Sequence, residues 1–259
     1  MRHPLLRLTK VSRRFGGLVA VDAVDLDVSK ETITGLIGPN GAGKSTLFHV
    51  ISGVLSPTEG EMFFDQTPIH GREPHEIAAL GMSRTFQNIQ IVKEMSVLEN
   101  TLIGCHLQGS AGFLKTAFPT RGVREEERRL IRSALEALSF VGLEQDAHKP
   151  AHLLPLGQLR LLELARALAS RPKLLLLDEI AAGLNHTETK RMGALIRKIR
   201  EQGVTVLLVE HDMDLVMSIC DRVVVLNQGQ KIAEGTPEEV RTDENVIRAY
   251  LGEETEVTG

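Results

Sequence analysis

Residues 38–45 read GPNGAGKS and match the phosphate-binding pattern G-x-x-x-x-G-K-S/T. Glycines in such a loop let backbone N–H groups approach an anion with no Cβ in the way. The apolar run ITGLI precedes the loop and LFHVISGV follows it, so we expect a strand before the loop and a helix after it, with the helix N-terminus pointing at the same anion. The residues that we expect to hold the phosphates of a nucleotide are Gly38, Asn40, Gly41, Gly43, Lys44, Ser45 and Thr46.

Three side chains of this loop have distinct expected roles. Lys44 would reach the β- and γ-phosphates, Ser45 would ligate Mg²⁺, and Thr46 would add a contact on the α-phosphate side. The alternative is a glycine-rich surface turn. The strand and helix patterns on either side favour the phosphate loop.

A pair of carboxylates, Asp178 and Glu179, ends the run KLLLLDE. A strand buried on both faces brings its carboxyl end to the ligand-binding edge of a parallel sheet. There Asp178 can hold Mg²⁺ through water, and Glu179 can orient or deprotonate an attacking water molecule. Two acids can also simply end a strand, but a phosphate loop in the same chain favours the catalytic interpretation.

A parallel sheet with helices on it must position these groups. The continuous apolar runs at 174–177 and 205–209 are typical of strands buried on both faces. The run VDAVDLDV alternates, which predicts a strand with Val24, Leu26 and Val28 on one face.

The remaining patterns predict helices and one hairpin. We expect a hairpin with its turn at Asn227–Gly229, and an amphipathic helix over NHTETKRMGALIRKIREQG with Gly203 as its C-cap. A mostly helical insertion is expected at about 88–165, and a C-terminal helix with Pro237 in its first turn at about 237–252. Inward-facing residues of the two amphipathic helices are expected to be Leu130, Ile131, Ala134, Leu135 and Leu138, and Met192, Leu195, Ile196 and Ile199.

The length and composition of the chain limit the classes of function that it can have. The 259 residues are enough for one large domain, and we treat 1–259 as a single domain that carries the insertion. The net charge of −4 argues against a nucleic acid partner, because phosphate backbones require clustered Lys and Arg. Cys105 and Cys220 lack metal-like spacing and are expected to be buried, reduced thiols of a cytosolic protein. Neither a signal peptide nor an apolar stretch of about 20 residues is present, so any work at a membrane would be done from the cytoplasmic side through a partner.

With these motifs fixed, the chain resembles the nucleotide-binding subunits of ABC transporters over nearly its whole length. Phe15, in VSRRFGG, sits where that family places an aromatic ring against adenine, although it could also be a core residue. Gln87, in RTFQNIQ, sits at the loop that couples the metal site to the membrane subunits. His211, in VEHDM, sits at the switch histidine that contacts the γ-phosphate.

The resemblance implies a fold and a catalytic set. The fold class is α/β: a P-loop NTPase core with a mostly parallel sheet, an N-terminal antiparallel β subdomain and an α-helical insertion. The implied catalytic residues are Glu179, His211 and Gln87, and the implied metal ligands are Ser45, Gln87 and Asp178.

The stretch LPLGQ, residues 154–158, sits at the signature motif, which is commonly LSGGQ and binds the ATP held by the opposite subunit. Leu156, Gly157 and Gln158 are expected to keep a weakened contact. Pro155 removes both a hydroxyl and an N–H donor. The alternative is a helix start without a ligand, because Pro favours first turns.

Three more positions depart from the family pattern. Ile180 stands where a Pro commonly follows the acidic pair, and Ala182 and Asn185 replace the Ser and Asp of the D-loop, here AAGLN. The D-loop crosses between subunits, so these changes bear on communication between sites. They leave Glu179 in place.

Within the family, the runs FGGLVAVDAVDL, RTFQNIQ, LENTLIG, AAGLN and VEHDM resemble the ATPases of branched-chain amino acid importers. That resemblance implies ATP and Mg²⁺ as ligands and a place at the cytoplasmic face of the inner membrane. The implied partners are a second ATPase subunit (a sister subunit or a second copy), two transmembrane permeases and, indirectly, a solute-binding protein. The alternatives are the ATPase of a urea or amide importer or of a lipopolysaccharide-type exporter, a nucleotide-gated binding module with little turnover, and a soluble ABC ATPase of translation or DNA repair.

Overall fold

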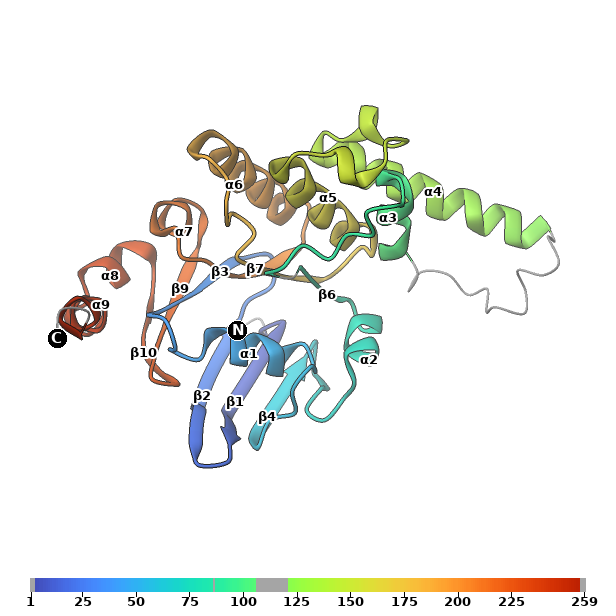
Figure 1. Cartoon of the computed structure of the whole chain (residues 1–259). Coiled ribbons are helices and arrows are strands. Elements are labelled where there is room, and N and C mark those ends of the chain that lie inside the picture. Colours follow the sequence, from blue (N-terminus) through green and yellow to red (C-terminus); the bar gives the residue numbers. More distant parts are fainter. Residues whose placement is uncertain (1–2, 86, 106–120, 257–259) are drawn as a thin grey trace.

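The computed structural model describes residues 3–85, 87–105 and 121–256. A six-stranded sheet with the order β10-β9-β3-β8-β7-β6 runs through the middle of the molecule (Figure 1). Neighbouring strands are parallel except β9 and β10. The strands are β3 (Ile33–Ile37), β6 (Met82–Arg84), β7 (Leu174–Asp178), β8 (Thr205–Val209), β9 (Arg222–Asn227) and β10 (Gln230–Gly235). The mostly parallel sheet expected from the apolar runs is confirmed.

A second, antiparallel sheet lies on one side of the first, with helix α1 (Lys44–Ile51) between them (Figure 1). Its strand order is β2-β1-β4-β5. The strands are β1 (Leu6–Phe15), β2 (Leu18–Val28), β4 (Glu59–Phe64) and β5 (Thr67–Pro68). The expected N-terminal antiparallel β subdomain is therefore confirmed, and so is the inward face of β2 formed by Val24, Leu26 and Val28.

Alternate residues of the central strands feed two separate hydrophobic cores. In β7, Leu174 and Leu176 belong to the core shared with α1 and the antiparallel sheet, whereas Leu175 and Leu177 belong to the core under the helices of the other face. Both faces of the strand are thus buried, which is why the sequence is apolar at every position. This double burial holds the carboxyl ends of the strands in fixed places.

Helices cover the other face and the rim of the central sheet (Figure 1). They are α2 (Pro74–Ala79), α3 (Val97–Gly104), α4 (Arg121–Val141), α5 (Leu156–Ala169), α6 (His186–Glu201), α7 (Met213–Ile219), α8 (Pro237–Thr242) and α9 (Glu244–Glu256), and short 3-10 turns lie at Glu144–Asp146 and Ala151–Leu153. Helices α3, α4 and α5 contact one another, and α5 continues past residue 165. The division of the chain into one domain with an insertion at about 88–165 stays a prediction.

The inward face predicted for α6 is confirmed, and that of α4 is confirmed except at Ile131, which is half-buried and does not belong to the core against which Leu130 and Leu135 pack. Ala134 and Leu138 are fully buried, and Met192, Ile196 and Ile199 are buried in the same core. Helix α6 ends one residue earlier than predicted, because Gln202 is the C-cap and Gly203 follows it with φ +86°. Glycine at that position allows the left-handed backbone that ends the helix.

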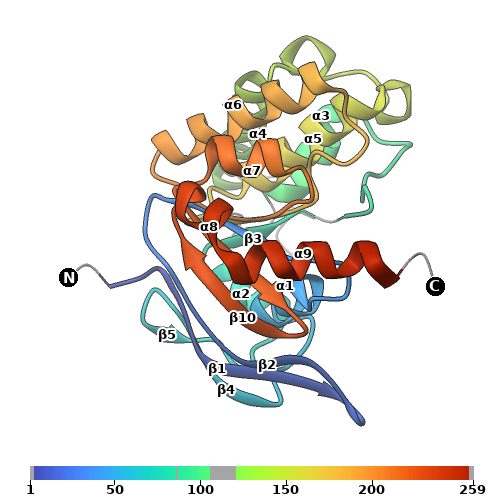
Figure 2. The same cartoon turned by 90° about the vertical axis from the view of Figure 1, so that its left-hand side faces the viewer.

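The C-terminal helix predicted at about 237–252 is wrong as a single element. The chain forms α8 and α9, which are separated at Asp243, where the backbone is extended (φ −73°, ψ 122°). The Asp243 carboxylate accepts hydrogen bonds from the N–H groups of Asn245 and Val246, so it caps a new helix rather than continuing the old one. Both helices pack beside β10 (Figure 2).

The β9–β10 hairpin joins the two sheets. Its turn residues, Gln228 and Gly229, both have positive φ, and Asn227 pairs with Gln230, so the predicted turn is confirmed. The Gly229 N–H donates to Ala42 O (3.1 Å) and the Gly229 carbonyl accepts from Asp22 N–H (2.9 Å). The turn therefore ties the phosphate loop to strand β2.

Cys105 and Cys220 are buried free thiols, as expected. Across the described residues, no helix combines the length and the apolar character that crossing a membrane requires.

Candidate active site

The phosphate loop leaves the carboxyl end of β3 and enters α1 at Lys44. Gly38, Gly41 and Gly43 have φ of +148°, +74° and +96°. A Cβ at Gly38 would lie 2.1 Å from Leu226 O, and one at Gly43 would lie 2.3 Å from Ala20 O. Glycine is thus required by both backbone conformation and space, and the loop keeps its amide-lined shape.

Lys44 is almost entirely buried inside this loop. Its ammonium group donates hydrogen bonds to Gly38 O at 2.6 Å and to Pro39 O at 2.8 Å. These two carbonyls carry no formal charge and do not neutralise the ammonium group, whose positive charge lies at the N-terminus of α1. A buried ammonium, a helix N-terminus and loop amides together fit a polyphosphate.

A cavity of about 640 Å³ opens over the phosphate loop. Phe15 forms part of its wall with 43% of its surface exposed, and the Arg13 guanidinium lies 4.7 Å from the centre of its ring. An exposed ring beside a phosphate loop can take a flat base. The lining residues are Phe15, Leu18, Val19, Ala20, Asn40, Gly41, Ala42, Gly43, Lys44, Ser45, Thr46, Gln87, Glu179, His211 and Gln228.

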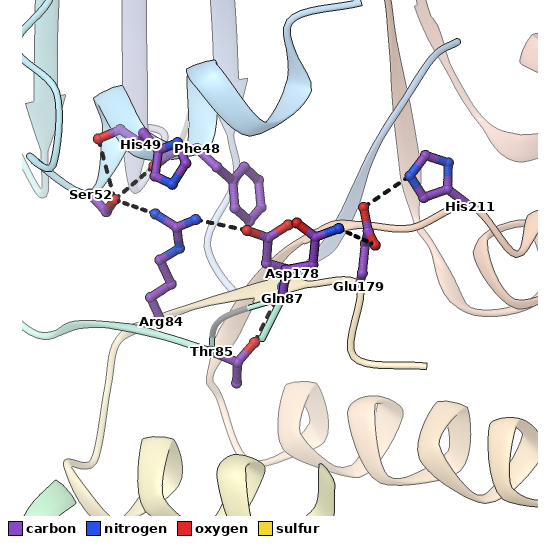
Figure 3. A network of polar contacts seen from close by, with 9 residues as sticks. All are labelled: Phe48, His49, Ser52, Arg84, Thr85, Gln87, Asp178, Glu179 and His211. Atoms are coloured by element: carbon purple, nitrogen blue, oxygen red, sulfur yellow. Dashed lines mark hydrogen bonds and ion pairs between the residues drawn. The ribbon is translucent and has the colours of Figure 1, made fainter. Parts of the chain in front are cut away.

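Glu179 lies at this cavity between two polar side chains (Figure 3). Gln87 Nε2 donates to Glu179 Oε2 at 2.9 Å, and His211 Nε2 lies 3.0 Å from Glu179 Oε1. The three residues come from the loops after β6, β7 and β8, whose carboxyl ends meet at one edge of the parallel sheet. The structure thus brings together three residues that lie far apart in the sequence.

Asp178 is placed differently from Glu179. Its Oδ2 lies 2.7 Å from Arg84 Nη2 in a buried ion pair, and Arg84 Nη1 donates to Ser52 Oγ at 2.9 Å (Figure 3). Asp178 is not among the residues that line the cavity. Arg84 was not predicted from the sequence, where it is one of many basic residues with no motif.

The residues around the cavity can accommodate Mg²⁺ only together with phosphates. Among the described residues, no group of three or more His, Cys, Asp or Glu side chains could hold a metal by itself. Ser45 and Gln87, however, both line the cavity, and each of their side chains carries an oxygen atom. Mg²⁺ commonly takes one or two protein oxygens and completes its shell with water and substrate phosphates, so these two residues fit the ion.

Glu210, next to His211, is a second residue that the sequence does not reveal. It is 4% exposed, and its Oε1 accepts a hydrogen bond from Ala181 N–H at 2.9 Å. Burial raises its carboxyl pKa to about 7. Hydrogen bonds from the backbone of Ala181 and His211 oppose this rise, and the negative charge of Glu179 adds to it. Glu210 thus connects the loop of His211 to the turn that follows Glu179.

LPLGQ lies on the first turn of α5, away from the cavity of its own chain. Pro155 is the N-cap of α5, and Leu156 is 44% exposed. A Cβ at Gly183 would lie 2.8 Å from Leu156 Cδ2, and one at Gly157 would lie 2.5 Å from Glu188 Oε1. The stretch thus packs on the loop 181–185 and the start of α6, with its helix N-terminus at the surface.

Asn185, which departs from the D-loop pattern, has a clear structural role. Its Oδ1 accepts from Glu188 N–H at 3.1 Å, and Glu188 Oε2 accepts from Asn185 N–H at 2.9 Å. This reciprocal pair is a capping box, which fixes the start of α6.

Two family models match the chain. The model described as ABC transporter matches residues 21–182, and the model described as branched-chain amino acid ATP-binding cassette transporter matches residues 230–256. The high-affinity branched-chain amino acid transport ATP-binding protein BraF of Pseudomonas aeruginosa is 47% identical over 254 residues, which cover 98% of this chain and 100% of BraF.

Solved structures are similar over the same extent. The ADP conformation of MJ1267, an ATP-binding cassette of an ABC transporter, has a TM-score of 0.85 and 35% identity, covering 97% of this chain and 100% of that one. The dimeric post-hydrolysis state of the ATP-binding cassette MJ0796, bound to ADP and Pi, has a TM-score of 0.75 and 25% identity, covering 90% of this chain and 98% of that one.

Proposed function

Because this chain belongs to the ATP-binding proteins of ABC transporters, we propose that it hydrolyses ATP to power an importer of branched-chain amino acids. The observation that carries the ATPase proposal is the position of Glu179 and the contacts of its carboxylate. Its two carboxylate oxygens are engaged by Gln87 and His211, beside the lysine of a phosphate loop. This is where a base would act on a water molecule attacking a γ-phosphate.

Binding of the nucleotide is the task of the loop and the aromatic wall. Phe15 stacks on the adenine, and the backbone N–H groups of residues 40–46, which line the cavity, surround the phosphates. Lys44 places its charge at the β- and γ-phosphates, and Thr46 contacts the α-phosphate side. Mg²⁺, when bound, supplies positive charge between the phosphates.

Turnover is the task of the residues at the sheet edge. Glu179 accepts a proton from the attacking water while Gln87 and His211 hold its carboxylate in place. His211 also donates to the γ-phosphate. Ser45 and Gln87 would hold the metal, and Asp178, which Arg84 holds in place, would act on it through water.

A second ATPase subunit completes each site in this proposal. In LPLGQ, Pro155 and Leu156 are exposed, Gly157 and Gln158 are half-buried, and none of the five residues lines the cavity of its own chain. We therefore assign Leu156, Gly157 and Gln158 to ATP bound by another subunit. The dimeric form of MJ0796 is consistent with such an arrangement. The partner is a sister ATPase or a second copy, and the pair acts on two permeases at the cytoplasmic face of the inner membrane, with a solute-binding protein delivering the cargo.

The cargo assignment rests on relatives. BraF is named for branched-chain amino acid transport, and the C-terminal family model coincides with β10, α8 and α9. In a strain that lacks its own high-affinity ATPase of this kind, the chain should restore uptake of labelled leucine, isoleucine and valine. Restored uptake of urea instead would overturn the cargo assignment and leave the ATPase proposal standing.

Glu179→Gln tests the catalytic proposal. The variant should bind ATP as the wild type does and release phosphate at least 100-fold more slowly, in line with the loss of a general base. With ATP and Mg²⁺ it should gain mass by light scattering on a sizing column. Glu201→Gln, at the exposed end of α6, is the matched control and should hydrolyse ATP normally. A wild type that binds ATP but shows no turnover, alone or with permeases, would favour the nucleotide-gated binding module.

A further inference from the structure

Three charged residues of α5 lie at intervals of three along a helix that is otherwise apolar on its inner side. Arg160 and Glu163 are 5% and 1% exposed, and Arg166 follows one turn later. Arg160 Nη1 and Glu163 Oε2 are 3.0 Å apart in an ion pair. A buried ion pair commonly stabilises a protein less than apolar side chains of similar size do. Stability alone therefore does not explain why charged residues occupy the buried side of α5.

All three side chains hold the backbone of the segment that carries Gln87. Arg160 Nη2 donates to Gln87 O at 3.1 Å, and Glu163 Oε1 accepts from Gln90 N–H at 3.3 Å. Arg166 Nη1 donates to Gln90 O. Both backbone groups of Gln90 are therefore held by α5, and the carbonyl of Gln87 is held as well.

Gln87 is thus bonded at its two ends to two different parts of the molecule. Its side-chain amide donates to Glu179 at the end of β7, and its backbone carbonyl accepts from Arg160 on α5. The same helix begins at Leu156 within LPLGQ. Gln87 therefore links the backbone hold of α5 to the carboxylate of Glu179.

We propose that Arg160, Glu163 and Arg166 are positioning residues that fasten the backbone of residues 87–90 to α5 and so keep the Gln87 side chain within reach of Glu179. The proposal rests on the proposed ATPase function. The three residues do not contact ATP in this proposal. Their loss should therefore change the rate of turnover and leave the binding of nucleotide to the phosphate loop intact.

The first test is the double substitution Arg160→Met/Glu163→Met. It replaces the buried pair by apolar side chains of similar length, which folded proteins commonly tolerate, and removes the bonds to Gln87 O and Gln90 N–H. We expect kcat for ATP hydrolysis to fall roughly 10- to 100-fold with KM nearly unchanged, as for a catalytic group displaced by about 1 Å. Arg171→Met/Glu136→Met removes an exposed pair between α4 and the loop that follows α5, and it is the matched control, with wild-type kcat.

Hydrogen–deuterium exchange on peptides spanning 87–92 provides a second readout that does not depend on catalysis. The Gln90 amide should exchange about tenfold faster in the double variant than in the control, because its acceptor is gone. Arg160→Lys keeps a cation beside Glu163 but cannot bridge to Gln87 in the same way, so it should give a smaller effect in the same direction. If the double variant does not show the wild-type melting transition, the same measurements are made on Arg160→Lys instead.

Two results would overturn the proposal. Unchanged exchange at 87–92 would mean that α5 does not hold this backbone, and faster exchange with unchanged kcat would mean that the hold does not position Gln87. A wild-type protein without ATP turnover would instead count against the proposed function. In that case the exchange data alone decide whether α5 fastens the segment.

Discussion

Arg84 and Asp178 face each other across 2.7 Å in an ion pair whose side chains are only 7% and 6% exposed. Removing one partner leaves the other charge buried, which is strongly destabilising. We expect Arg84→Met to lower the free energy of unfolding by about 3–5 kcal/mol in urea denaturation. Adding Asp178→Asn should recover much of this loss.

Arg7→Met is the control for this prediction. Arg7 pairs with Asp27 at 3.0 Å, but both side chains are about half exposed. Exposed pairs are worth roughly 0–1 kcal/mol. Equal losses for Arg84→Met and Arg7→Met would show that burial of the Asp178 pair has no energetic consequence.

Gly43→Ala should impair both nucleotide binding and stability. The new Cβ would lie 2.3 Å from Ala20 O, and the residue has φ +96°, so the phosphate loop has to shift. Calorimetric titration should show at least a tenfold loss of ATP affinity, equivalent to about 1.4 kcal/mol. Gly203→Ala meets the same left-handed strain, roughly 1–2 kcal/mol, with open space around its Cβ. It should therefore lower the melting temperature while ATP binds as in the wild type, and weakened binding there would contradict the local explanation.

Glu210 should make stability depend on pH. Its carboxyl pKa is raised by burial from 4.5 to about 7, so the folded state holds a proton that the unfolded state has lost between these values. This contribution is fully present below about pH 4.5 and is lost as pH rises through 7, by about 3 kcal/mol. Glu210→Gln removes the titration and keeps an oxygen for Ala181 N–H.

The measurement is the free energy of unfolding of both proteins at pH 5.5 and pH 8.5. The stability of Glu210→Gln relative to wild type should increase with pH. Relative stability that stays constant across this range would refute a carboxyl pKa near 7.

Pro155→Ser should strengthen ATP-dependent association. Pro155 is the N-cap of α5, and a serine there restores a hydroxyl that can cap the helix and bond a phosphate from the partner subunit. One hydrogen bond to a charged group is worth about 1.5–3 kcal/mol, so the dimer of a Glu179→Gln background should form at tenfold lower concentration or less. Leu153→Ser, at an exposed position just before the motif, is the control and should change nothing. Equal dimerisation of both variants would show that position 155 does not contact ATP.

Much of the fold and part of the site could be predicted because the responsible signals are local. The phosphate loop can be recognised by its glycines, because few other residues adopt their positive φ easily. The strands can be recognised by continuous apolar runs, because both of their faces are buried. The family resemblance and its motif order implied that Gln87, Glu179 and His211 form one catalytic set, whereas the rule that parallel strands end at one edge was applied only to the acidic pair. The structure brings all three side chains together.

Buried charges were missed for a physical reason. Arg84 and Glu210 look like ordinary polar residues in sequence, because their partners lie about 94 and 29 positions away. The spacing of Arg160, Glu163 and Arg166 is a signal that could have been used, since three charges on the apolar side of a helix are unusual. Asp243 was overlooked because a pattern that continues through it outweighed its capping ability.

The hairpin turn at Gly229 bonds at once to the phosphate loop through Ala42 and to the antiparallel sheet through Asp22. Three segments around the proposed nucleotide site are thus hydrogen-bonded to one another without a ligand, so the binding of ATP would cost little chain entropy on this side. The base and the phosphates would then contact a wall of the site that is already ordered. The free energy of binding would therefore go into contacts with the ligand rather than into ordering this wall of the cavity.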